Sequence, residues 1–135
     1  RKYDSCAWER EVKHMLLLYD VCRRLHIICP VNFIYARDDG SAVKVAFTEE
    51  GEVCRIWLKL KLDDLRKRFE YPCFLYSRDS WLINLNHVRK VYSHQLITDD
   101  GTSFPLNSEQ VSEISEILRQ DPVRFRDVDR VGRKW

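Results

Sequence analysis

Polar residues that suit recognition of nucleic acid stand out in two short stretches of this chain. Arg78 is predicted to donate two hydrogen bonds to guanine O6 and N7, and its neighbour Asp79 to accept one from cytosine N4. Further along the chain, Asn107 or Gln110 is expected to pair with adenine. Side chains of these types suit hydrogen bonds to base edges.

Serine hydroxyls and helix N–H groups supply the complementary contacts to phosphate. Ser41 and Ser80 lie in polar turns, and a predicted helix begins at Asn107. Phosphate contacts of this kind position a duplex, while the base contacts provide the specificity.

Motifs for catalysis or metal binding are missing from the sequence. It contains no G-x-S-x-G, no H-E-x-x-H and no glycine-rich phosphate loop. The four histidines show no ligand spacing, and the five cysteines are odd in number and lack C-x-x-C. We therefore expect a protein that is not an enzyme, with no metal or cofactor, whose cysteines are free thiols in a reducing cytoplasm.

Composition predicts one ordinary globular domain. The chain has 135 residues, of which 44% are hydrophobic and 33% charged. Its net charge of +2 means that any basic groups that bind nucleic acid must be clustered. No apolar run approaches the ~20 residues of a membrane span. Because the chain opens at Arg1 and its sole methionine is Met15, we expect a fragment of a longer protein, with a sensor or receiver domain upstream.

Residues 1–28 are predicted to form an N-terminal helix over Ser5–Ile27. Ser5 is a plausible N-cap, and Trp8, Val12 and Met15 share one helix face. Either this helix packs on the β core or continues a linker, or it is a dimerising or partner-docking element. The second alternative would give a homodimer or a complex with a partner protein.

Residues 31–120 are predicted to form the β domain, and the elements follow from alternation and turn residues. The expected elements are a hairpin over Val31–Thr48, strands over Val53–Lys59, Trp81–Leu85 and Gln95–Thr98, a short helix over Leu62–Phe69 and a last helix beginning at Asn107 with Gln110 at the capping-box spacing. Residues 121–135 are a basic tail, either a frayed terminus or a phosphate-binding arm.

Two stretches, FLYSRDSWLINLNHVRKV from Phe74 and DDGTSFPLNSEQVSEISEIL from Asp99, resemble the LytTR family of bacterial DNA-binding domains. The family signature is F-x-x-x-H/R-x-S, three apolar residues and N, matched here by Phe74, Arg78, Ser80, Trp81, Leu82, Ile83 and Asn84. The downstream D-G-x-x-apolar-P-apolar run is matched by Asp100, Gly101, Phe104, Pro105 and Leu106. The resemblance covers about Val31 to Leu118, most of the chain.

This resemblance implies a mainly β fold: an elongated antiparallel sheet or sandwich with a short internal helix and a C-terminal helix, to which this chain adds its N-terminal helix. It also implies that loops on one edge of the β structure, rather than a recognition helix, enter successive major grooves, with dimers on repeated half-sites. The corresponding loops are Arg37–Lys44, Ser77–Ser80 and Asn107–Gln110. The candidate DNA contacts are Arg37, Ser41, Lys44, Arg78, Asp79, Ser80, His94, Asn107, Ser108 and Gln110.

Three positions depart from the residues that family members carry. Ala42 lacks a base-contacting side chain, Asp79 adds a negative charge near the phosphates, and Ser108 stands where arginine is usual. Each change weakens the electrostatic attraction that supplies most nonspecific affinity. The resemblance predicts a sequence-specific transcriptional regulator, and the three departures favour the alternative of a LytTR-like domain repurposed as a protein-interaction or regulatory module.

Overall fold

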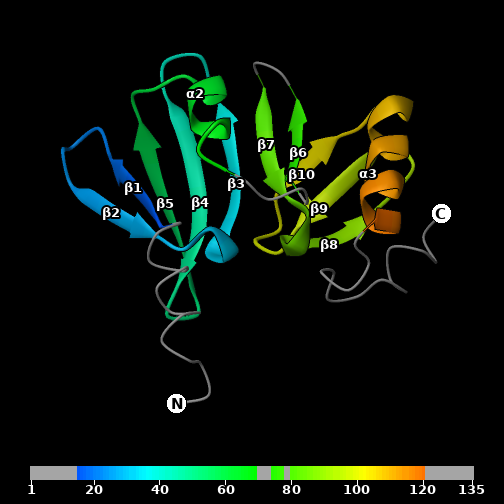
Figure 1. The fold of residues 1–135 in the computed structure, drawn as a ribbon, viewed down its shortest axis with the longest axis horizontal. Helices are drawn as coiled ribbons and strands as arrows, with labels where there is room; N and C mark the ends of the chain where they lie inside the picture. The colour runs from blue at the N-terminus through cyan, green and yellow to red at the C-terminus, as the bar shows by residue number, and fades with distance from the viewer. Residues whose placement is uncertain (1–14, 70–73, 78–79, 121–135) are drawn as a thin grey trace.

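The computed structural model of this chain is mainly antiparallel β structure (Figure 1), and it describes residues 15–69, 74–77 and 80–120. The strands are β1 (Leu16–Tyr19), β2 (Leu25–Ile28), β3 (Phe33–Asp38), β4 (Val43–Glu49), β5 (Glu52–Leu58), β6 (Phe74–Ser77), β7 (Trp81–Asn84), β8 (Val88–Val91), β9 (Gln95–Thr98) and β10 (Ser103–Pro105). The helices are α2 (Leu62–Arg66) and α3 (Ser108–Gln120), with 3-10 turns η1 (Pro30–Asn32) and η2 (Leu85–His87). The basic tail predicted for residues 121–135 lies outside the described residues, and none of the described helices is long and apolar enough to cross a membrane.

A five-stranded sheet in the order β5-β4-β3-β7-β6 forms the centre of the fold, with every neighbouring pair antiparallel. The predicted hairpin is confirmed as β3 and β4, although Val31 and Asn32 belong to η1 instead. The strand predicted at Gln95 is confirmed as β9, the middle strand of the sheet β10-β9-β8. The short internal helix is confirmed as α2, which ends at Arg66 rather than at Phe69.

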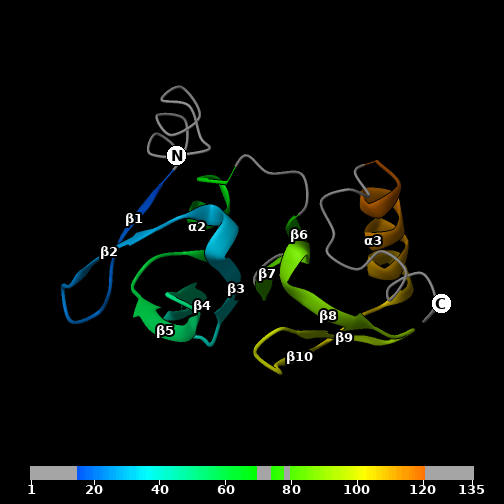
Figure 2. The ribbon, with the colours of Figure 1, turned by 90° about the horizontal axis from the view of Figure 1, so that it is seen from below.

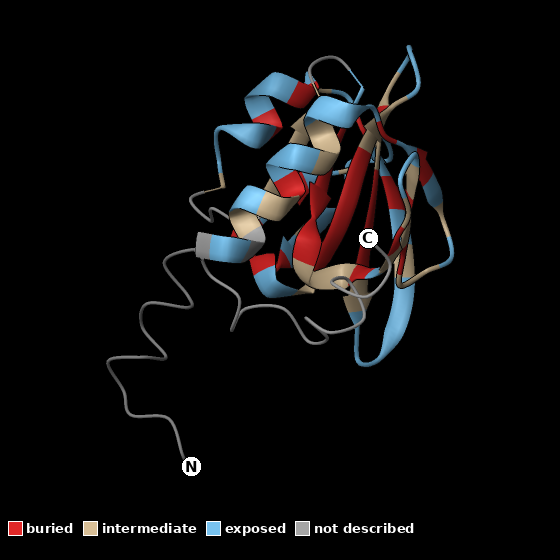
Figure 3. Cartoon of the chain, turned by 90° about the vertical axis from the view of Figure 1, so that its right-hand side faces the viewer, coloured by how far each residue is buried: buried red, intermediate tan, exposed pale blue. Residues whose placement is uncertain are grey.

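Both faces of the central sheet are covered. On one face, the β1–β2 hairpin and α2 enclose a core cluster with β3 and β4. On the other face, β8, β9, β10 and α3 enclose a second cluster (Figure 3). Because β3 carries residues of both clusters, Phe33, Ile34, Tyr35 and Ala36 are all 0–1% exposed, and a register shift lies between Phe33 and Tyr35. This double burial explains an unbroken apolar run where simple alternation was expected.

The N-terminal region corrects the predicted helix. Over the described part, from Leu16 to Ile28, the chain forms the antiparallel hairpin β1–β2, and residues 1–14 of the prediction lie outside the described residues. The turn is held by Asp20, whose carboxylate accepts hydrogen bonds from the amides of Cys22 and Arg24 at 2.8 and 3.0 Å. It also pairs with the ring of His26 at 2.8 Å. A helix would leave this carboxylate without its turn donors, and a run such as Leu-Leu-Leu-Tyr fits either periodicity.

The strand geometry gives the hairpin two apolar faces. Leu16 and Leu18 are 3% and 1% exposed and face the core, while Leu17 and Tyr19 are 56% and 66% exposed. The hairpin and α3 lie at opposite ends of the molecule (Figure 2). The hairpin is therefore part of the folded core and also presents an apolar outer surface.

Candidate nucleic-acid interface

Three polar segments distant in sequence lie along one edge of the molecule, the upper edge in Figure 1. They are the β3–β4 turn, the adjoining ends of β6 and β7, and the start of α3. Arg37 on β3 pairs in register with both Lys44 on β4 and Trp81 on β7, and the amide of Asp38 donates to the Ser80 carbonyl at 2.9 Å. The described part of the predicted loop surface therefore lies on a common edge.

The β3–β4 turn is closed by its own carboxylates. Asp38 accepts from the amide of Gly40 at 2.8 Å, and Asp39 accepts from the amides of Ser41 and Ala42 at 3.2 and 3.0 Å. The backbone amides of this turn are therefore already occupied. The exposed Ser41 hydroxyl, 3.5 Å from an Asp39 oxygen, is the group the turn can offer to a phosphate.

Arg37 turns toward the second sheet. Its Nη2 donates to the Ser103 carbonyl at 3.3 Å, and its guanidinium carbon lies 4.5 Å from the centre of the Phe104 ring. This contact joins β3 to β10, the strand that leads into α3. Arg37 therefore helps to set the spacing between the first and third segments, and only its remaining donors are left for a duplex.

Lys44, the other basic candidate of the first segment, is half-buried, with its ammonium 5.8 Å from the centre of the Trp57 ring. No carboxylate in the described part of the chain pairs with it within 4.0 Å. Its charge is therefore available to a phosphate at this edge.

Arg78 and Asp79 of the second segment lie outside the described residues, and the structure describes the residues on either side of them, Ser77 and Ser80. The Ser80 amide donates to the Ser77 carbonyl at 3.0 Å, and Ser77 pairs in register with Trp81. This short closure keeps the exposed Ser80 next to the end of β3.

The third segment contains the predicted capping box. The amide of Asn107 donates to Gln110 Oε1 at 2.9 Å, and the amide of Gln110 donates to Asn107 Oδ1 at 2.8 Å. A two-bond pairing with adenine uses an amide oxygen together with an amide nitrogen. Because both oxygens already accept a backbone N–H, adenine recognition by either residue needs the second lone pair of that oxygen. Ser108, the first residue of α3, is exposed.

His94 lies in the β8–β9 turn, beside the third segment. Its carbonyl accepts from the amide of Leu106 at 2.9 Å, one residue before Asn107. Its Nδ1 is 3.2 Å from the Ser93 hydroxyl. The fold thus brings this histidine to the neighbourhood of the capping box, which its sequence position did not reveal.

Negative charge is also present near the edge. Glu109 and Glu113 are exposed on the first turns of α3, and burial together with the nearby Glu109 raises the pKa of Glu113. Glu113 lines a groove of about 520 Å³, and among the described residues its lining also includes Arg66, Lys67, Phe69, Phe74, Tyr76 and Leu82. The cations of this groove were missed as candidates, since Arg66 and Lys67 in sequence suggest only a solvated helix face. Within the described residues, no cluster of three or more His, Cys, Asp or Glu side chains could hold a metal ion.

Two residues of the sequence signature have structural roles. Asn84 is 1% exposed, and its amide nitrogen donates to the Phe33 carbonyl at 2.9 Å while its oxygen accepts from the Asn86 amide at 3.0 Å. Asp100, before Gly101 with its φ of 86°, accepts from Thr102 Oγ1 and Arg55 Nη2, both at 2.9 Å. The signature therefore includes residues of the scaffold as well as residues of the predicted contact surface.

Comparison with known proteins supports this architecture. No family model and no curated protein matches the chain by sequence. Among solved structures, the fold is similar to the LytTr DNA-binding domain of a methyl-accepting/DNA response regulator from Bacillus cereus, with a TM-score of 0.60 and 17% identity. The superposition covers 77% of this chain and 95% of that domain. The chain therefore has the LytTR-type fold, and the resemblance predicted from the signature is confirmed at the level of fold.

Proposed function

We propose that this chain, whose fold is that of a LytTr DNA-binding domain, binds double-stranded DNA as the noncatalytic module of a bacterial cytoplasmic transcription regulator. The observation that carries the proposal is that the β3–β4 turn, the β6–β7 ends and the start of α3 lie along one edge. Polar segments that share one edge can lie against a duplex and reach successive grooves, whereas polar loops on different sides of the molecule cannot.

Roles follow from the contacts that each residue already makes. Lys44, Ser41 and Ser80 contact phosphates. The amide of Ser108 does so as well, since the two cap bonds of α3 use the amides of Asn107 and Gln110 instead. Arg78 reads guanine, with Asp79 beside it. Arg37 contributes mainly by position, because its guanidinium is held against Phe104.

The test starts with selection of bound sequences from a pool of random duplexes. Anisotropy on the selected duplex is then measured at ~50 and ~200 mM salt, where each phosphate contact should weaken binding by about 3-fold. Arg78→Ala should cost about 1–3 kcal/mol on the selected duplex and relax the preference at one base pair.

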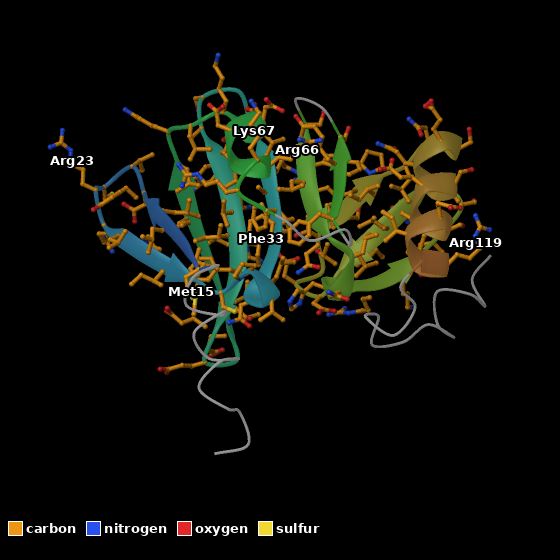
Figure 4. The ribbon with its side chains drawn as sticks, in the orientation of Figure 1. Met15, Arg23, Phe33, Arg66, Lys67 and Arg119 are labelled. Carbon is orange, nitrogen blue, oxygen red and sulfur yellow. The ribbon has the colours of Figure 1, made fainter. Side chains whose placement is uncertain are left out.

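Arg119→Ala is the matched control, since Arg119 is an exposed arginine near the far end of α3 (Figure 4). It should leave affinity and preference unchanged. Binding that is absent at both salt concentrations, or that does not depend on salt, would overturn the proposal. Equal loss by Arg78→Ala on every sequence would assign Arg78 to phosphate instead.

One observation favours the alternative of a protein-interaction module. The outer face of the β1–β2 hairpin carries Leu17, Tyr19, Leu25 and Ile27, which are 47–66% exposed and pair across the two strands. Exposed apolar groups of this kind are typical of contact surfaces between proteins. A domain that uses only this face, as a homodimer or with a partner, would show no salt-dependent affinity for duplex DNA.

A further inference from the structure

Basic charge in the described part of the chain is concentrated around α2. The segment from Lys59 to Arg68 contains five basic and two acidic residues, a net charge of +3, while the whole chain carries +2. All five basic side chains are exposed: Lys59, Lys61, Arg66, Lys67 and Arg68. Clustered charge of this kind is the electrostatic footprint expected of a surface that contacts phosphates.

This segment lies on the same edge as the three polar segments. Figure 1 shows the β5–α2 connection and α2 at the upper edge, next to the β3–β4 turn. In Figure 4 the side chains of Arg66 and Lys67 lie at that edge, between β3 and the end of β6. Burial of Leu62 and Leu65, 2% and 0% exposed, fixes α2 against the sheet and so fixes the side of the helix that carries the cations.

The two cations of α2 differ in how they are held. The Arg66 guanidinium carbon lies 4.8 Å from the centre of the Tyr76 ring, and Arg66 makes no ion pair among the described residues. Stacking on Tyr76 orients the guanidinium without neutralising its charge. Lys67 pairs with Asp63 at 3.3 Å, and both side chains are more than half exposed, so this pair is weak. Arg68 differs, because it donates to the Leu17 carbonyl at 3.2 Å and is directed to the hairpin.

We propose that Arg66 and Lys67, with Lys59 and Lys61 of the preceding connection, form a phosphate-contacting surface that extends the DNA footprint beyond the three polar segments. The inference rests on the proposed function. This surface also supplies positive charge to an edge whose first segment has little of it. Arg37 is held against Phe104, and Asp38 and Asp39 offset the first segment, so that segment carries little net positive charge.

Across the groove, Glu113 faces the same space as Arg66 and Lys67. A phosphate near this groove is attracted by one wall and repelled by the other. The surface therefore predicts opposite effects of removing positive and negative charge, a result that loss of folding cannot imitate.

The experiment compares the full chain with Arg66→Ala, Lys67→Ala and Glu113→Gln on the selected duplex and on an unrelated duplex of the same length. For each alanine variant, the slope of log affinity against log salt should fall by about 1. Its deficit relative to the unsubstituted chain should be about 3-fold larger at ~50 mM than at ~200 mM salt. Both duplexes should show the same deficit, because phosphate contacts carry no sequence information. Glu113→Gln should tighten binding on both duplexes.

Arg119→Ala again serves as the control for removing an exposed arginine away from the edge. If the unsubstituted chain binds DNA with a steep salt dependence but Arg66→Ala and Lys67→Ala behave like Arg119→Ala, the α2 surface is wrong and the proposed function stands. If the unsubstituted chain does not bind duplex DNA, the proposed function fails and takes this inference with it. Thermal unfolding of each variant should be unchanged, because these side chains are exposed.

Discussion

At the scale of single residues, the sequence signature joins two different tasks. Ser80 is exposed at the edge, whereas Asn84, four residues later, is 1% exposed and bonds to the Phe33 carbonyl and the Asn86 amide. Asn84 thereby ties β7 to the start of β3. An asparagine is suited to this place because one side chain supplies both a donor and an acceptor.

Asn84→Ala is therefore expected to destabilise the fold rather than to alter base preference. The change removes the hydrogen bonds of Asn84 to the Phe33 carbonyl and the Asn86 amide at a site that is 1% exposed, which should lower the free energy of unfolding by about 1–3 kcal/mol. Urea denaturation measures this loss, with Asn32→Ala, at a half-buried site in η1, as the control. A variant that keeps full stability but changes its preferred sequence would show that Asn84 contacts DNA.

At the scale of elements, the local pattern predicted most of the β domain. The strands β4, β5 and β9, the helix α2 and the α3 cap all lie where alternation, turn residues and capping chemistry predicted them. The prediction of an N-terminal helix was wrong over Leu16–Ile28, because Leu16 to Tyr19 is uniformly apolar and its hydrophobic pattern has no unique period. Packing of Leu16, Leu18 and Ile28 on the sheet decides for a hairpin.

Successive side chains of β1 alternate between the core and the outer face, so substitutions at two neighbouring residues can test the hairpin. Leu18→Ala removes a side chain that is 1% exposed and should cost about 2–5 kcal/mol of stability. Leu17→Ala removes one that is 56% exposed and should change stability by about 0.5 kcal/mol or less. Chemical denaturation of both variants gives the difference directly, and equal losses at the two positions would contradict the hairpin.

At the scale of the whole molecule, a polar cluster joins the two sheets. Arg55 on β5 pairs with Asp100 in the β9–β10 turn at 2.9 Å, and the Asp100 side chain is 1% exposed. Burial by itself would raise the pKa of Asp100, but hydrogen bonds from Thr98, Thr102 and Arg55 outweigh it and lower that pKa below the ordinary 3.8. The ionised carboxylate is therefore the form that holds the turn against the central sheet.

The pH dependence of stability follows from the direction of this shift. Because the pKa of Asp100 is lower in the folded chain, its contribution is fully present above pH 3.8 and is lost as the pH falls through the folded-state value. Asp100→Asn should lower the free energy of unfolding at neutral pH by about 1–3 kcal/mol and reduce the acid-induced loss. Unfolding measured between neutral pH and the acid limit tests this, and Asp64→Asn, at an exposed site, should retain the acid-induced loss of the unsubstituted chain.

The candidate site was predictable only in part from the sequence. The residues of the three loops were identifiable from their polarity and from the LytTR resemblance, and the common edge was expected from that resemblance alone. Three features could not be predicted from the sequence: the contact of Arg37 with Phe104, the occupied amide oxygens of Asn107 and Gln110, and the position of Arg66 and Lys67. Each of these depends on which atoms other elements bring within contact distance.

Three features could be predicted from neighbouring residues alone: the turn at Asp38–Gly40, the Asp100–Gly101 turn and the reciprocal cap of α3. In these features a side chain bonds to the backbone two or three positions away, so the local sequence is sufficient. Tertiary structure decided whether Leu16–Ile28 forms a helix or a hairpin, and which cations share an edge. Those outcomes depend on burial against distant strands, and an apolar run is compatible with more than one element until the surface that covers it is present.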